Sequence, residues 1–102
     1  MRQFAVYANP SERSRRVIPY FVAMQSHLLE SHVAVVAPMI VQDGRSAFTL
    51  TSVAVTFANK AYIVLVGELT SVDVRALQRA RGDLKTYEDD IRRALDRLFT
   101  GF

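Results

Sequence analysis

Few residues of this chain have types and spacings that could support catalysis or metal binding. The two histidines, His27 and His32, are five positions apart, whereas two ligands on one helix face are four apart. Ser26 precedes His27 as a nucleophile would precede its base, but adjacent side chains of a strand point to opposite faces. The chain has no cysteine, which excludes disulfides and thiolate-ligated zinc. We therefore expect no catalytic residue, no metal site and no cofactor.

Three aspartates near the end of the chain are the only other candidates for a carboxylate site. Asp89 and Asp90 are adjacent, so on a helix their side chains diverge by about 100°, and they do not converge with Asp96 on one point. Acidic residues in the first turn of a helix complement its macrodipole, which explains them without catalysis. The four glycines are too widely spaced for a phosphate-binding loop.

An arginine cluster, Arg13, Arg15 and Arg16, is the one concentration of like charge. It lies in a polar stretch with Ser11, Glu12 and Ser14, and its simplest interpretation is a solvated loop. The alternative is an electrostatic patch for an acidic partner segment or for phosphates. Elsewhere the charges are mixed, although the net charge is +3.

The chain has 102 residues, of which 50% are hydrophobic, and this predicts a single domain spanning residues 1–102. No repeat, linker or low-complexity tract interrupts it. The longest apolar stretch, residues 33–41, is too short to cross a bilayer and contains Pro38. Because Met1 leads directly into a strand-like segment without signal-peptide features, we expect a cytoplasmic protein with no membrane contact.

Several short segments have the composition of β-strands. Residues 4–7 form the first, ended by the turn signal Asn9-Pro10, and residues 17–24 form the second. Because Pro19 lacks an N–H, we expect the second strand to be at an edge or bulged. Residues 33–37 are continuously apolar, which is typical of a strand buried on both faces.

The next segments predict a strand at residues 47–51 and a hairpin of residues 53–57 and 61–66. Thr70-Ser71 is expected to cap a helical turn over residues 72–77, with Asp73 near its positive end.

The last element is predicted to be a long helix. Apolar residues in steps of three and four form one face, namely Leu84, Tyr87, Ile91, Leu95 and Leu98. Thr86-x-x-Asp89 resembles a start signal, and Gly101 is suited to a left-handed helix end. Strands followed by a helix predict a mainly β, α+β domain: a small antiparallel barrel with the helix packed against it.

The end of the chain resists a purely structural explanation. Phe102 is the final residue and Phe99 precedes it by one helical turn. Chain ends usually fray into water, where a large apolar side chain gains nothing. Phe102 could fold back on the helix as a cap contact, or the aromatics could form a probe that enters a partner's pocket.

Three stretches in order carry a resemblance to the CcdB family, the toxin components of CcdA/CcdB type II toxin–antitoxin systems. Residues 3–7 (QFAVY) resemble the family's opening Gln-Phe-x-Val-Tyr strand. Residues 21–29 (FVAMQSHLL) are similar to its Phe-Val-x-Val-Gln-Ser-x stretch with two hydrophobic residues after it. Residues 90–102 resemble the closing helix Asp-Ile-Lys-x-Ala-Ile-Asn-x-x-Phe-Trp-Gly-Ile without a gap.

The resemblance implies a small SH3-like antiparallel barrel with extra strands and a long C-terminal helix, assembled as a homodimer. It further implies a non-enzymatic toxin that binds the DNA gyrase A subunit, traps its cleaved-DNA complex and is neutralised by a CcdA-like antitoxin. DNA would be contacted only indirectly. By position, the gyrase-binding residues would be Leu28, Leu29, Asp96, Phe99, Thr100, Gly101 and Phe102. The antitoxin-binding residues would be Gln3, Phe4 and Tyr7.

One departure concerns the gyrase contact directly, because Thr100 stands where the family's best-known members have tryptophan. Threonine cannot stack, and Asp96 in place of asparagine adds a charge. Two alternatives therefore stay open. One is a divergent CcdB-like protein that binds only its antitoxin. The other is a MazF-like endoribonuclease on the same barrel, for which the arginine cluster with Glu12 would have to supply the catalytic groups.

Overall fold

A computed structural model describes residues 2–25, 32–44 and 49–101. Within these residues, seven strands precede a single α-helix, α1 (Glu88–Thr100), and three short 3-10 turns, η1 (Val66–Glu68), η2 (Val74–Ala76) and η3 (Lys85–Tyr87), lie between the later elements. The strands are β1 (Ala5–Ala8), β2 (Tyr20–Ala23), β3 (Val33–Val41), β4 (Ser52–Phe57), β5 (Lys60–Leu65), β6 (Thr70–Asp73) and β7 (Gly82–Asp83).

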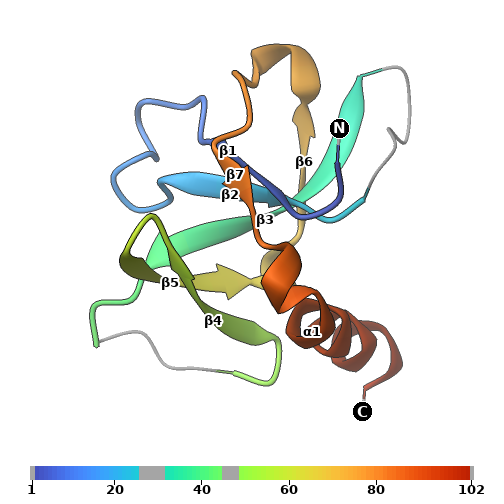
Figure 1. Ribbon diagram of the computed structural model, residues 1–102. Helices are drawn as coiled ribbons and strands as arrows, with labels where there is room; N and C mark the ends of the chain where they lie inside the picture. The colour runs from blue at the N-terminus through green and yellow to red at the C-terminus, as the bar shows by residue number, and fades with distance from the viewer. Residues whose placement is uncertain (1, 26–31, 45–48, 102) are drawn as a thin grey trace.

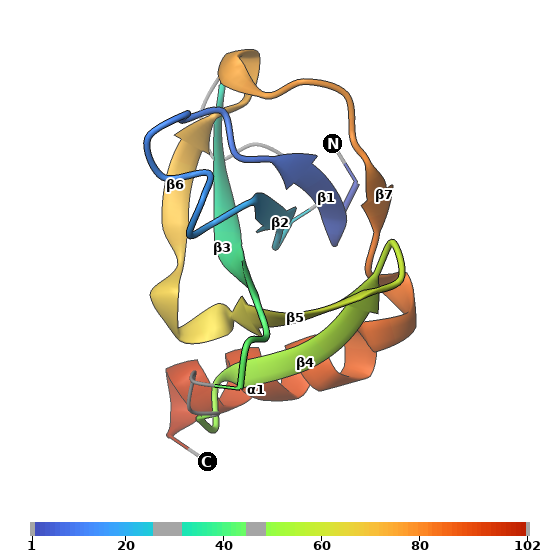
Figure 2. The ribbon, with the colours of Figure 1, turned by 90° about the vertical axis from the view of Figure 1, so that its left-hand side faces the viewer.

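The strands form one antiparallel sheet in the order β4-β5-β3-β2-β1-β7, and β6 also pairs with β3. The sheet curls into a half-barrel, and α1 runs alongside β4 (Figures 1 and 2). This confirms the predicted mainly β, α+β fold with a barrel and a C-terminal helix. No helix in the described part of the chain is long and apolar enough to cross a membrane.

Strand β3 lies at the centre of the sheet and pairs with three other strands. Its proline lies between two of these pairings. One edge of β3 pairs with β2, including Pro38 opposite Phe21. The other edge pairs with β6 through residues 33–36 and with β5 through residues 39–41. Pro38 falls between these two pairings, so its missing N–H deprives neither ladder of a hydrogen bond.

Three of the predictions are wrong. Pro19 does not place its strand at an edge: β2 begins after it, at Tyr20, and lies between β1 and β3. The predicted strand at residues 47–51 is a turn over the part that the structure describes, residues 49–51. The predicted cap Thr70-Ser71 instead belongs to strand β6, because this segment pairs with β3.

The helical turn expected over residues 72–77 is present only as the short turn η2, and its cap is Asp73 and not Thr70-Ser71. The Asp73 carboxylate accepts a hydrogen bond from the Arg75 backbone N–H at 2.9 Å. Helix α1 also lacks the expected Thr86-x-x-Asp89 start: it begins after Tyr87 with no side-chain cap, because η3 leads into it.

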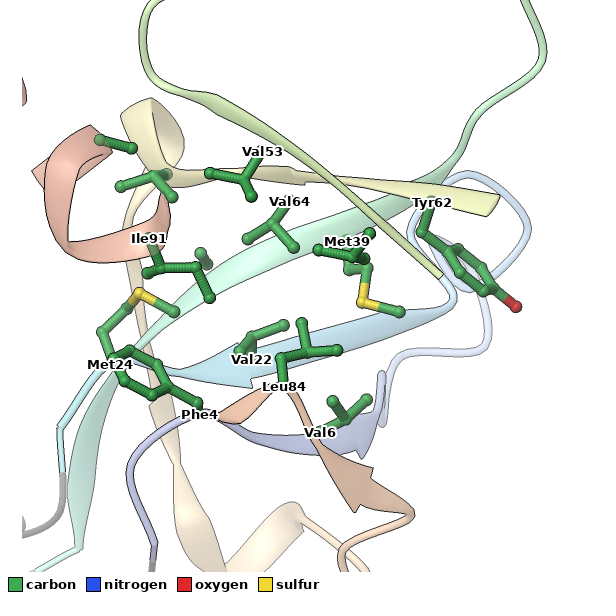
Figure 3. Close-up of a cluster of buried hydrophobic side chains, with 14 residues drawn as sticks. Phe4, Val6, Val22, Met24, Met39, Val53, Tyr62, Val64, Leu84 and Ile91 are labelled. Carbon is green, nitrogen blue, oxygen red and sulfur yellow. The ribbon is translucent and has the colours of Figure 1, made fainter. Parts of the chain in front are cut away.

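The predicted hairpin and the apolar face of the last helix are confirmed. Strands β4 and β5 pair from Ser52–Leu65 to Phe57–Lys60, joined by Ala58 and Asn59. Helix α1 buries Ile91 and Ala94 completely. They join a core that includes Phe4, Met39 and Leu84 (Figure 3). The barrel core therefore continues under the helix and holds it in place.

Candidate functional site

The outward face of helix α1 near its C-terminus carries the exposed residues of the candidate site. Side chains on a helix advance by about 100° per residue, so Asp96, Phe99 and Thr100 lie away from the buried Ile91. All three are exposed, and Phe99 exposes 73% of its surface. A partner that covered this aromatic ring would gain hydrophobic free energy, because the ring would be removed from water.

The last turn of the helix is closed by local hydrogen bonds. The Thr100 hydroxyl donates to the Asp96 carbonyl at 2.5 Å, so this hydroxyl is used within the helix. Gly101 has a φ of +79°, and its N–H donates to the Arg97 carbonyl at 2.9 Å, which is the predicted left-handed helix end. A Cβ at Gly101 would meet nothing within 4 Å, so the backbone here is open to a partner.

Leu50 is an exposed apolar residue beside this helix end that sequence reasoning missed. It exposes 74% of its surface, and its carbonyl accepts a hydrogen bond from the Arg97 guanidinium at 3.2 Å. Arg97 and Phe99 point to different flanks of the helix, so Leu50 lies on the flank opposite Phe99. The available signal in the sequence is an apolar residue between two threonines, but this residue falls within the strand predicted at residues 47–51.

Four of the seven predicted gyrase-binding residues therefore occupy one helix end: Asp96, Phe99, Thr100 and Gly101. The other three, Leu28, Leu29 and Phe102, lie outside the described residues, as do Ser26 and His27.

The three residues expected to bind the antitoxin have different environments. Phe4 is 1% exposed and belongs to the core, with the Arg92 guanidinium 5.6 Å from its ring centre. Gln3 is half-buried: its amide donates to the Met24 carbonyl at 3.1 Å and accepts from Arg92 at 3.2 Å. Tyr7 is half-buried in β1. Gln3 and Tyr7 thus have surface to offer, whereas the Phe4 ring supports the helix from beneath.

The polar groups singled out for catalysis are dispersed in the structure. His32 is exposed next to β3, and its carbonyl accepts the Val74 N–H at 2.8 Å. Asp90 pairs with Arg93 at 2.8 Å on the surface of α1. Within residues 2–25, 32–44 and 49–101, no group of three histidine or carboxylate side chains could hold a metal ion.

The comparison with protein families settles what kind of protein carries this helix end. Residues 3–101 match the family described as CcdB protein. The chain belongs to the CcdB family. It is accordingly a CcdB-like toxin of a toxin–antitoxin system. No curated protein sequence matches it.

Solved structures share the fold of this CcdB-family chain at low sequence identity. The Mycobacterium tuberculosis toxin MazF-mt6 has a TM-score of 0.65 at 16% identity, covering 94% of this chain and 96% of its own. A crystal structure described as an Mtb toxin has a TM-score of 0.59 at 19% identity, covering 81% of this chain and 97% of its own. At such identities the likeness establishes the fold alone.

Proposed function

We propose that this CcdB-family toxin binds the DNA gyrase A subunit through the exposed end of helix α1 and poisons the gyrase–DNA cleavage complex without catalysis of its own. The observation that carries the proposal is Phe99, which is 73% exposed on a helix otherwise fixed by Ile91 and Ala94. A poison needs only to bind one conformation of gyrase better than the others, and an exposed aromatic anchor supplies such binding energy.

The contact surface that we propose is the set carried over from the family, with one addition. It comprises Leu28, Leu29, Asp96, Phe99, Thr100, Gly101 and Phe102, and Leu50 extends it on the other flank of the helix. In a homodimer a two-fold axis presents this surface twice, so two copies of the aromatic probe face the same target.

Thr100 is the weak point of the proposed contact. With its hydroxyl bonded to the Asp96 carbonyl, Thr100 offers a methyl group where an aromatic ring would stack. The lost contact area and cation–π attraction are worth on the order of 1–3 kcal/mol. We therefore expect gyrase binding weaker than that of a tryptophan-bearing toxin.

A CcdA-like antitoxin is the second partner in this proposal, and both contacts would occur in the cytoplasm. Gln3 and Tyr7 have exposed surface near the opening strand and are the residues we assign to the antitoxin contact. Phe4 would act from the core by holding Arg92, which bridges to Gln3.

Capture of purified gyrase A subunit by the immobilised toxin tests the proposed target. Relative to the wild type, Thr100→Trp should strengthen capture by roughly tenfold or more, and Phe99→Ala should abolish it, because each changes the aromatic area at the helix end. Val17→Ala is the matched control, since Val17 is also 70% exposed but lies in a loop, and it should leave capture unchanged.

The same experiment separates the proposal from its main alternative. If neither the wild type nor Thr100→Trp captures gyrase while the antitoxin is still bound, the protein is a divergent member that binds only its antitoxin. In cells, expression without antitoxin should stop growth, and deleting residues 101–102 should abolish toxicity while the fold persists. Full toxicity of the deletion variant would remove the helix end from the mechanism.

The structural likeness to MazF-mt6 supports one further candidate, an endoribonuclease toxin. The arginine cluster with Glu12 would have to supply its base and its cations. Incubation of the pure protein with single-stranded RNA tests this candidate, since specific cleavage would favour the nuclease and intact RNA would remove it.

A further inference from the structure

A pocket of about 290 Å³ lies between two arginine-bearing loops, away from the C-terminal end of helix α1. We call residues 10–19 the first arginine loop and residues 74–81 the second. The pocket lining includes Arg15, Pro19 and Tyr20 on one side and Gln78 and Arg81 on the other. In both Figure 1 and Figure 2, these loops lie at the opposite end of the molecule from the C-terminus.

The first arginine loop is organised around a buried asparagine. Asn9 is 1% exposed, and its amide donates to the Ser14 hydroxyl at 2.8 Å and to the Ile18 carbonyl at 2.9 Å. Its side-chain oxygen accepts the Ser11 N–H at 2.9 Å. Every polar atom of this amide is used, so Asn9 shapes the pocket wall and fixes the loop.

Arg15 is held in place before any ligand arrives. Its Nε donates to the Asn9 carbonyl at 2.8 Å and Nη2 donates to the Pro10 carbonyl at 3.4 Å. These carbonyls orient the guanidinium without neutralising its charge, and the remaining N–H groups stay available. A preorganised arginine loses less conformational entropy on binding an anion than a free side chain would.

The charge of the pocket is uncompensated within the described residues. Arg81 is fixed at its backbone, where its N–H donates to the Val6 carbonyl at 2.7 Å, but its side chain makes no ion pair there. No carboxylate is among the lining residues. Arg75 on the same loop differs, because Asp73 binds it at 2.7 Å. The unpaired arginines of the two loops therefore create a positive field that favours an anion.

Tyr20 and Pro19 add an aromatic and an apolar residue to the pocket lining. Tyr20 lies in edge contact with Phe57 and Tyr62, with ring centres 5.4 and 5.6 Å away, so its ring is held rigidly. Pro19 adjoins it in the lining. Guanidinium groups beside a fixed aromatic ring suit a phosphate attached to a planar base, whereas a simple carboxylate would use the arginines alone.

We propose that this pocket binds a nucleotide, with its phosphate between Arg15 and Arg81 and its base against Tyr20. The nucleotide is either free or part of a single-stranded nucleic acid, since both present the same chemistry. The lining holds neither a histidine nor a carboxylate that could act as a general base, so the pocket binds without cleaving. This inference uses no residue of the proposed gyrase contact and stands independently of it.

Fluorescence anisotropy with a short labelled single-stranded oligonucleotide of mixed sequence tests the pocket. We expect saturable binding that Arg81→Gln weakens about tenfold, because one charge-assisted phosphate contact is lost. The slope of log affinity against log salt should fall by about 0.7. Arg93→Gln removes the same charge from helix α1 and should change affinity little. Arg15→Gln should weaken binding as Arg81→Gln does, with folding of both variants checked by circular dichroism.

Competition with adenosine monophosphate distinguishes the two sources. If adenosine monophosphate displaces the oligonucleotide, the pocket is a single-nucleotide site. If it does not, the pocket binds a polynucleotide. Both outcomes support the proposed binding site. Equal weakening by Arg81→Gln and Arg93→Gln would overturn the proposal, because binding would then be unspecific attraction to a basic protein. The proposal would also be overturned if the protein bound no oligonucleotide. A labelled glutamate-rich peptide is a second probe, and binding of this peptide alone would overturn the proposal too.

Discussion

At the scale of single residues, Asp73 and Arg75 form the most tightly organised ion pair of the described chain. Asp73 accepts hydrogen bonds from the Arg75 guanidinium at 2.7 Å and from its backbone N–H at 2.9 Å. The side-chain bond first, and the backbone bond second, lower the pKa of Asp73 from 3.8 to about 2. The pair caps η2 and so begins the second arginine loop.

The direction of this pKa shift determines how the pair responds to acid. Because the folded-state pKa is lower than the unfolded one, the stabilisation is complete above about pH 4 and is lost as the pH falls toward 2. Arg75→Gln should move the pKa of Asp73 back toward 3.8, as read from an NMR titration of its carboxyl carbon. Arg93→Gln changes an arginine far from Asp73 and should leave the pKa of Asp73 low. An Asp73 pKa that stays near 2 without Arg75 would contradict this assignment.

At the scale of elements, the β4–β5 hairpin contains a stabilising substitution that the sequence suggests and the backbone explains. Ala58 and Asn59 both have positive φ, at 50° and 63°, as a two-residue hairpin turn requires. Asparagine tolerates this conformation and alanine pays a steric penalty. Ala58→Asn should therefore raise the free energy of unfolding by about 0.5–1 kcal/mol, measured by urea denaturation.

Ala61 provides the matched control for this hairpin. It is exposed like Ala58 but lies in β5, opposite Thr56, in extended conformation. Asparagine is disfavoured in strands, so Ala61→Asn should lower stability. If both substitutions changed the free energy of unfolding in the same direction, the turn conformation would not be the cause.

At the scale of the whole molecule, we expect a homodimer that leaves the exposed Phe99 free and presents it twice. A two-fold contact is the usual way in which one surface of a small domain is covered or presented twice. We expect sedimentation equilibrium to give twice the mass of the chain, and the midpoint of thermal unfolding to rise with protein concentration. A single-chain mass together with a concentration-independent midpoint would refute the homodimer.

Helix α1, the β4–β5 hairpin and the helix end could be predicted locally. Helix α1 has its apolar face in steps of three and four, the β4–β5 hairpin alternates around a short turn, and Gly101 ends the helix; each signal lies within a few residues of its effect. The same holds for the exposed face with Asp96, Phe99 and Thr100, because helical periodicity fixes which side chains oppose the buried ones.

Contacts between distant segments decided the remainder. Thr70–Asp73 becomes a strand because β3 offers it an edge, and Pro38 is tolerated in the sheet centre because two ladders meet there. Arg97 links Leu50 to the helix end by a hydrogen bond, and Arg15 and Arg81 line one pocket although they belong to different loops. The sequence by itself determines the periodicity of helix and hairpin and the residue types at the end of helix α1. Which strands pair and where pockets form depend on contacts between residues far apart in the chain. The free energy of these contacts arises only in the tertiary structure.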